Sequence, residues 1–165
     1  MNIEPNLLLA AVLVGFGATL VMDAWALLLK RAFDIPSLSY CLVGRWLRHM
    51  PAGTFKHASI GAAAPKPREC TVGWIAHYLI GAIFAVALVA LAPAEWLQRP
   101  TLWPALLFGV ATVAVPFLIM QPSFGFGIAA SKTPNPRQAR LKSLLTHAVF
   151  GFGLYLSALV LSRFF

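Results

Sequence analysis

Three ionisable side chains lie inside apolar stretches of this sequence: Asp23, His77 and His147. Carboxylate and imidazole groups exchange protons and bind cations, and within a membrane they usually face a bundle interior or a water-filled cavity. Each lies about 7–10 Å from the adjacent basic loop, counted at 1.5 Å of helix per residue. We therefore predict that all three share one level and line one pocket together with Thr19, one helical turn before Asp23.

Each of these residues also has a purely structural interpretation. The carboxylate could bond a neighbouring hydroxyl or histidine, and each ring could be a hydrogen-bonded anchor near the membrane surface. Gly81 and Gly151 follow the two histidines by four residues. They leave room beside each ring for either a ligand or a neighbouring helix. Zinc or another borderline cation would suit one carboxylate with two imidazoles, and haem would suit the two histidines, so the cofactor stays open.

The elements that must position these residues are four long apolar runs. The chain has 165 residues, 59% hydrophobic and only 11% charged, whereas soluble domains carry about 25% charged residues. Each run approaches the ~20 residues that cross a bilayer as a helix. We predict an all-α integral membrane protein, a four-helix bundle forming one domain over 1–165, with spans at about 7–29, 72–91, 102–120 and 144–161.

The basic residues predict how the spans are oriented. The loops at about 30–71 and 121–143 hold eleven of the thirteen Lys and Arg residues. Cytoplasmic loops carry such an excess, so we expect both loops in the cytoplasm and both termini in the periplasm. Because the first run exceeds a signal-peptide core and retains Asp23, we expect it to be a permanent span. Cys41 and Cys70 then lie in a reducing compartment, where we expect thiols and no disulfide.

The first cytoplasmic loop has its own helical pattern. The segment Pro36–Met50 carries apolar residues on one stripe and basic residues beside it, which predicts a short amphipathic helix on the inner leaflet. Arg45, Arg48 and Lys56 would then contact anionic phospholipids. The alternative is a linker that folds against the bundle. No nucleic-acid-binding module accompanies the net charge of +8, so we expect no nucleic-acid partner.

The third run should be irregular, because Pro116 lies well inside it and is expected to kink the helix. Several stretches along the chain, among them "GFGATLVMDAW", "VGRWLRHMPAGTFKH", "ECTVGWIAHYLIGAIFA", "PFLIMQPSFGFGIAASKTPNP" and "HAVFGFGLYL", are similar to one family. They resemble an uncharacterised family of small bacterial four-span inner-membrane proteins, known as a domain of unknown function. The resemblance implies a multi-pass protein of the bacterial inner membrane and brings no activity or ligand.

The function must therefore be argued from the residues. We favour transport or sensing of a small ion, proton or solute through the cytoplasm-facing Asp/His pocket, and expect a homo-oligomer because four spans are few for a transporter. The alternative is an accessory or lipid-binding protein that acts through its basic loops. A membrane-embedded enzyme is a further alternative, as is a bis-histidine haem protein. Since no nucleophile elbow, P-loop or zinc-protease motif is present, we assign no catalytic residue.

Overall fold

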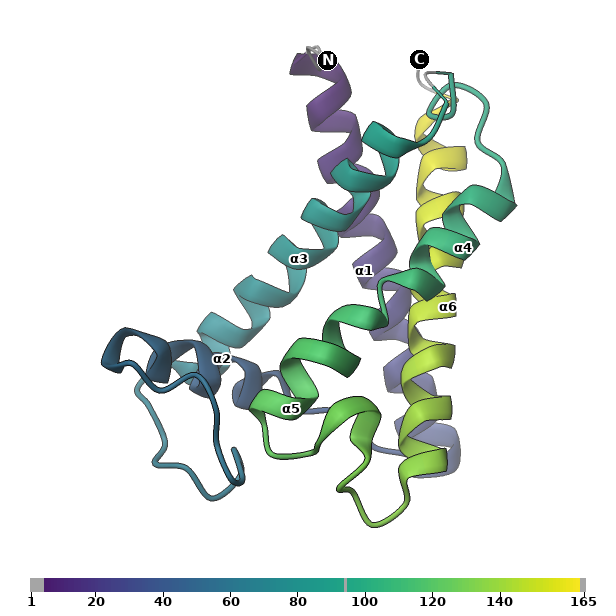
Figure 1. Ribbon diagram of the computed structural model, residues 1–165. Coiled ribbons are helices and arrows are strands. Elements are labelled where there is room, and N and C mark those ends of the chain that lie inside the picture. The colour runs from purple at the N-terminus through teal and green to yellow at the C-terminus, as the bar shows by residue number, and fades with distance from the viewer. Residues whose placement is uncertain (1–4, 94, 164–165) are drawn as a thin grey trace. The chain divides into compact units, whose positions relative to one another are not determined.

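The computed structural model describes residues 5–93 and 95–163, and the part of the chain that it describes contains helices and no strand (Figure 1). Three helices are long: α1 (Pro5–Phe33), α3 (Glu69–Leu91) and α6 (Pro136–Leu161). The shorter elements are α2 (Tyr40–His49), α4 (Leu102–Ala111), the three-residue α5 (Gln121–Ser123), a π-helix at Pro116–Met120, and 3-10 turns at Met50–Ala52 and Ile128–Ala130. The prediction of an all-α protein is confirmed.

Four segments are long and apolar enough to cross a membrane: Leu7–Phe33, Glu69–Leu91, Leu102–Ser123 and Pro136–Leu161. They contain the four predicted spans and extend beyond them mainly at the ends next to the basic loops. Many of their large apolar side chains are exposed, including Leu9, Leu20, Ile83 and Leu107. Apolar surface of this kind suits lipid and would be unfavourable in water. The prediction of a four-span membrane protein is therefore confirmed.

The chain forms two compact units, each described here by itself. Unit 1 consists of Met1–Pro36, Tyr78–Thr112 and Leu145–Phe165, and unit 2 of Ser37–His77 and Val113–Leu144. The core of unit 1 is built largely from small and aliphatic side chains of its helices, such as Val14, Ala18 and Leu154, none more than 1% exposed. Small residues let membrane helices approach closely, and here they do.

Within unit 1, α1 and α3 meet along a line of small residues. A Cβ atom on Gly15 would lie 2.6 Å from the Cα of Ala82, and one on Gly81 would collide with the hydroxyl of Thr19. The Thr19 hydroxyl donates to the Gly15 carbonyl at 2.8 Å, and the side chain is 1% exposed. The face of α1 that carries Gly15 and Thr19 is thus the contact between the two helices. The space beside Gly81 is therefore filled by the neighbouring helix α1.

Gly151 likewise allows α6 to approach α4 closely. These two helices lie side by side in Figure 1. A Cβ atom on Gly109 of α4 would collide with the Cα of Gly151, and one on Gly151 would lie 2.8 Å from the Ala105 carbonyl. Both glycines after the two histidines therefore admit a neighbouring helix.

The third span is broken, as the proline inside it predicts. Helix α4 ends at Ala111, and Thr112 and Val113 form a turn before the chain becomes helical again. Pro116 has no N–H for the carbonyl of Thr112, and its ring crowds that carbonyl. The break therefore falls four residues before the proline. Pro116 then begins the π-helix, in which the Gln121 N–H donates to the Pro116 carbonyl.

Unit 2 combines short helical segments and irregular chain around a small apolar core. Val43, Ile60 and Phe124 are buried together, with Trp46 packing edge-on against Phe124. Backbone bonds from His57 to the Ser123 carbonyl and from Ile60 to the Phe124 carbonyl tie the first loop to the end of the third span.

The predicted short helix in the first loop is present as α2, and it packs against the start of α3. Its residue Gly44 is in contact with the Glu69 carbonyl at the start of α3, and Gly73 of α3 is in contact with the Tyr40 carbonyl. The helix therefore rests on the start of a spanning helix, and its position at the inner leaflet stays a prediction. Glycine on both sides makes the contact possible.

Candidate functional site

Asp23, on α1, accepts a hydrogen bond from α3. The hydroxyl of Tyr78 donates a hydrogen bond of 2.9 Å to Oδ2 of Asp23, and both side chains are half-buried. A carboxylate within apolar helices needs such a donor, because burial of an unpaired charge is costly. Thr19 lies one turn away along the same contact between α1 and α3. Asp23 and Thr19 therefore lie along one helix contact, and a pocket that they share stays a prediction.

His147, on α6, lies beside the break in the third span. Its Nδ1 atom is 2.7 Å from the hydroxyl oxygen of Thr112, and that hydroxyl donates a bond of 2.6 Å to the Gly109 carbonyl. A hydroxyl has one proton, so Nδ1 is the donor in the bond between the ring and Thr112. The Nε2 atom then holds the lone pair of the neutral ring and is the atom that can accept a proton.

His77 belongs to unit 2 and has aromatic neighbours. Its ring stacks on Tyr40 of α2 with centroids 3.9 Å apart, and Trp74 approaches edge-on at 5.8 Å. The side chain is 9% exposed. Because Asp23 and His147 belong to unit 1 and His77 to unit 2, a pocket shared by all three stays a prediction.

A groove in unit 1 has a different character from the predicted pocket. It has a volume of about 340 Å³ and is lined by α1 and α6, with Gly17 and Ser157 as its small residues and Leu13 and Val160 among its apolar ones. Neither Asp23 nor His147 lines it. Among the described residues of either unit, no group of three His, Cys, Asp or Glu side chains is placed to hold a metal ion.

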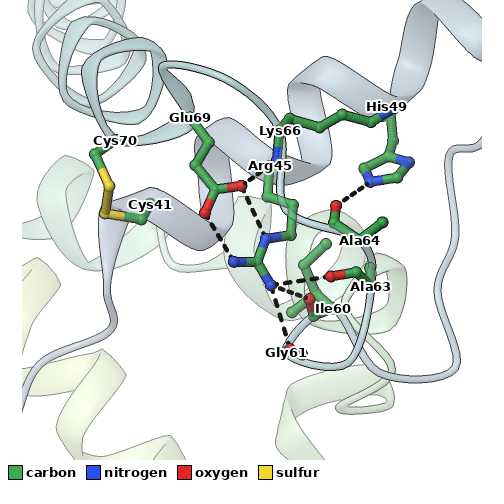
Figure 2. A network of polar contacts seen from close by, with 10 residues as sticks. All are labelled: Cys41, Arg45, His49, Ile60, Gly61, Ala63, Ala64, Lys66, Glu69 and Cys70. Atoms are coloured by element: carbon green, nitrogen blue, oxygen red, sulfur yellow. Dashed lines mark hydrogen bonds and ion pairs between the residues drawn. A yellow bond between two sulfur atoms is a disulfide. The ribbon is translucent and has the colours of Figure 1, made fainter.

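An extensive polar network lies in unit 2 and centres on Arg45 (Figure 2). The guanidinium group donates to both carboxylate oxygens of Glu69, at 2.7 and 2.9 Å. A third nitrogen donates to the carbonyls of Ile60, Gly61 and Ala63, at 3.1–3.3 Å. The hydrogen bond with Glu69 is the main cause of a raised pKa for Arg45. The guanidinium group of Arg45 therefore connects the carbonyl groups of the loop to Glu69.

This network bears on the lipid contacts that were predicted for the first loop. Arg45 was expected to contact anionic lipid, but its side chain is only 13% exposed and bonds five acceptors within the protein. Arg48 and Lys56 are exposed, and their contact with lipid stays a prediction. The backbone N–H of Lys66 also donates to Oε2 of Glu69, at 2.8 Å.

The prediction that Cys41 and Cys70 remain thiols is wrong, because a disulfide joins them. The physical reason is the close contact of α2 and α3 at Gly44 and Gly73, which brings the two cysteines together across 29 residues of sequence. A signal was present in the sequence. The pattern Cys-x-Val-Gly occurs at 41–44 and again at 70–73, so each cysteine has a glycine three residues later on the same helical face.

Comparison with known proteins adds the family and no activity. The chain matches the family described as "Protein of unknown function (DUF2938)" over residues 12–161. No curated protein and no solved structure matches it. The resemblance to an uncharacterised family of membrane proteins is confirmed, and the four apolar spans fit it. Since the match covers nearly the whole sequence, the chain belongs to this family, DUF2938, whose function is unknown.

Proposed function

We propose that this membrane protein moves a small cation across the bilayer, with the proton as the ion that its chemistry suits best. Asp23 and His147 would be the groups that exchange the proton. The observation that carries the proposal is the bond between His147 and Thr112 at the break in the third span. Interrupted helices with ionisable residues beside the interruption are typical of ion and substrate sites in transporters.

The local geometry supports an exchanging role for His147. The Thr112 hydroxyl fixes the ring through Nδ1 and leaves Nε2 as the basic atom. A ring fixed by a second residue keeps one tautomer, which suits repeated uptake and release of a proton at one atom. The Tyr78 hydroxyl donates to Oδ2 of Asp23 and positions the carboxylate, a group that can take up a proton or a cation.

The proposal includes a setting in the cell. We propose the bacterial inner membrane, with the basic loops in the cytoplasm and both termini in the periplasm, supported by the eleven Lys and Arg residues of the two loops. A homo-oligomer belongs to the same proposal, because four spans in one chain are few for a transporter. Impermeant maleimide added to intact cells after reduction should leave Cys70 unlabelled. Labelling before lysis would contradict this orientation.

Proton movement can be measured directly in liposomes that contain a pH-sensitive dye. A potassium diffusion potential set with valinomycin should drive proton flux above that of protein-free liposomes. His147→Gln and Asp23→Asn should each reduce that flux to the protein-free level, and Thr112→Val should reduce it partly. His49→Gln, in the first loop, serves as the matched control. Wild-type flux equal to that of protein-free liposomes, or unchanged flux in both variants, would contradict the proposal.

A second candidate function is binding of anionic lipid through unit 2. Its exposed basic side chains support this candidate: Arg48, Lys56, Arg68, Lys132, Arg137 and Arg140. Each cation near an anionic surface contributes about 1 kcal/mol. Native mass spectrometry of protein extracted from phosphatidylglycerol-containing membranes should detect fewer retained anionic lipids for Arg48→Gln with Lys56→Gln. Arg163→Gln, in unit 1, is the control, and equal retention in all three proteins would contradict lipid binding.

A further inference from the structure

The repeated Cys-x-Val-Gly pattern places two cysteines opposite one another in unit 2. Cys41 and Gly44 lie on one face of α2, and Cys70 and Gly73 lie on one face of α3. A Cβ atom on either glycine would collide with a carbonyl of the other helix. The backbones therefore touch, and both helices present their cysteines at the same contact. The disulfide between them is a product of this arrangement.

The two sulfur atoms differ in their surroundings. Cys70 is exposed and is the second residue of the 23-residue helix α3, whereas Cys41 is half-buried on α2. Backbone N–H groups at the start of a helix stabilise a negatively charged sulfur. A thiolate of another molecule can therefore reach Cys70 more easily than Cys41. Cys70 is also the better leaving group in the second step of an exchange.

A second connection holds the same two helices without the disulfide. Arg45 is one turn after Cys41, and Glu69 immediately precedes Cys70, so their ion pair lies next to the disulfide (Figure 2). Arg45 also bonds the loop carbonyls at Ile60, Gly61 and Ala63. After reduction, these contacts keep α2 beside α3. The two thiols then remain close enough to form the disulfide again.

We propose that Cys41 and Cys70 are a reversible thiol–disulfide exchange site, whose reductants are dithiols. A thiolate of the dithiol attacks Sγ of Cys70, the bond between the two cysteines breaks, and Cys41 leaves as a thiolate that takes a proton from water. The second thiolate of the dithiol then attacks the other sulfur of the same dithiol, which is bound to Cys70 in the mixed disulfide. Cys70 leaves as a thiolate that takes a proton from water. Two electrons and two protons pass from the dithiol, which becomes a disulfide, to the two cysteines.

This inference goes beyond cation transport and does not depend on it. The cytoplasm, where we propose the loop to lie, contains dithiol reductants that keep thiols reduced. An exposed disulfide there would respond to the supply of those reductants. Reduction would remove one of the two connections between α2 and α3 and leave the ion pair as the other.

The test uses the full chain in membrane vesicles equilibrated with graded ratios of reduced to oxidised dithiothreitol. Thiols are then trapped with a polyethylene-glycol maleimide and resolved on a gel. We expect one two-electron transition, with the same midpoint whether the sample starts reduced or oxidised. Cys41→Ser and Cys70→Ser should each show one labelled thiol at all ratios. Arg45→Gln should slow reoxidation, because it removes the second connection, while Arg48→Gln, one turn away and exposed, should not.

Two results would overturn the proposal. The disulfide could resist dithiothreitol until a denaturant unfolds the protein, which would make it a permanent structural bond. The thiols could also stay unpaired at every ratio, so that no disulfide forms in the membrane. Proton flux does not enter either of these results. This test and the test of transport therefore succeed or fail separately.

Discussion

Unit 1 and unit 2 hold their helices together by different means. In unit 1, helix backbones touch at glycines such as Gly81 and Gly109, and Asp23 and His147 each bond a hydroxyl group. In unit 2, a disulfide and an ion pair connect the same two helices. The difference has a physical cause. Lipid-facing helices satisfy their own backbone groups, whereas the irregular loop has free carbonyls that require donors such as Arg45.

The largest effect is expected for Gly44→Ala. The new Cβ atom would collide with the Glu69 carbonyl, which is backbone and cannot swing aside. Helix α2 would move away from α3, so both the disulfide and the ion pair would be lost. We expect the free energy of unfolding to fall by about 3 kcal/mol or more, measured by thermal unfolding in mild detergent, with little disulfide on a non-reducing gel.

Gly61→Ala is the matched control for that variant, because the nearest atom to its new Cβ would be Ser59 Oγ at 3.8 Å. If both variants are equally stable and both form the disulfide, the glycine contact between α2 and α3 is not what holds unit 2.

Glu69→Gln should have the next largest effect, and the effect should depend on redox state. The amide keeps the size of the side chain but removes the charge that pairs with Arg45. Hydrogen bonds to charged groups contribute about 1.5–3 kcal/mol. We expect a loss in that range after reduction and a smaller loss while the disulfide is intact. Thermal unfolding with and without dithiothreitol measures both. Exposed Glu95→Gln is the control, and losses independent of reduction would show that the two connections act separately.

Gly109→Ala tests the corresponding contact in unit 1. Its Cβ atom would collide with the Cα of Gly151, at a place where no covalent bond joins α4 to α6. The helices can separate slightly, so we expect a loss of about 1–3 kcal/mol in the free energy of unfolding. Ala111→Gly, at an exposed position in the same helix, measures the contribution of helix propensity alone. An increase in stability for Gly109→Ala would show that this contact is loose.

The smallest expected effect is the pH dependence of unit 2 from His57. Burial lowers the pKa of His57, and the neighbouring His49, with ring centroids 5.0 Å apart, lowers it further. The unfolded chain therefore binds a proton at higher pH than the folded one. The contribution of neutral His57 to the free energy of unfolding is fully present above the ordinary histidine pKa of about 6.5. This contribution falls as the pH drops below that value. His57→Gln should flatten the dependence of the unfolding temperature on pH between about 5 and 7. An unchanged slope would contradict this assignment.

Periodic features of the sequence predicted much of unit 1. Runs of about 20 apolar residues identified the spans. The spacing of Thr19 and Asp23 placed both on one face of α1, the face that contacts α3, because residues four apart share a helical face. Proline chemistry placed the break in the third span. These signals are local, and helices in a membrane are largely determined by local sequence.

Unit 2 could not be derived in the same way, because its partners are distant in sequence. Arg45 resembled a lipid-facing cation on an amphipathic helix, yet its carboxylate partner follows it by 24 residues. The disulfide was not predicted because the loop was assigned to the cytoplasm, where thiols stay reduced. The repeated Cys-x-Val-Gly pattern, which places both cysteines beside a glycine contact, was not considered. In unit 1, Thr112 and Tyr78 were missed as the partners of His147 and Asp23, since hydroxyl residues are common in any helix.

The π-helix at Pro116–Met120 has a consequence for insertions and deletions. A π-turn contains one residue more than the α-turn that it replaces, so a sequence one residue shorter can close the same turn with α-helical bonds. Loss of one residue inside α1 would instead rotate everything beyond it by about 100° and turn Asp23 away from α3. Members of this family should therefore differ in length by single residues at 116–120 far more readily than anywhere along α1.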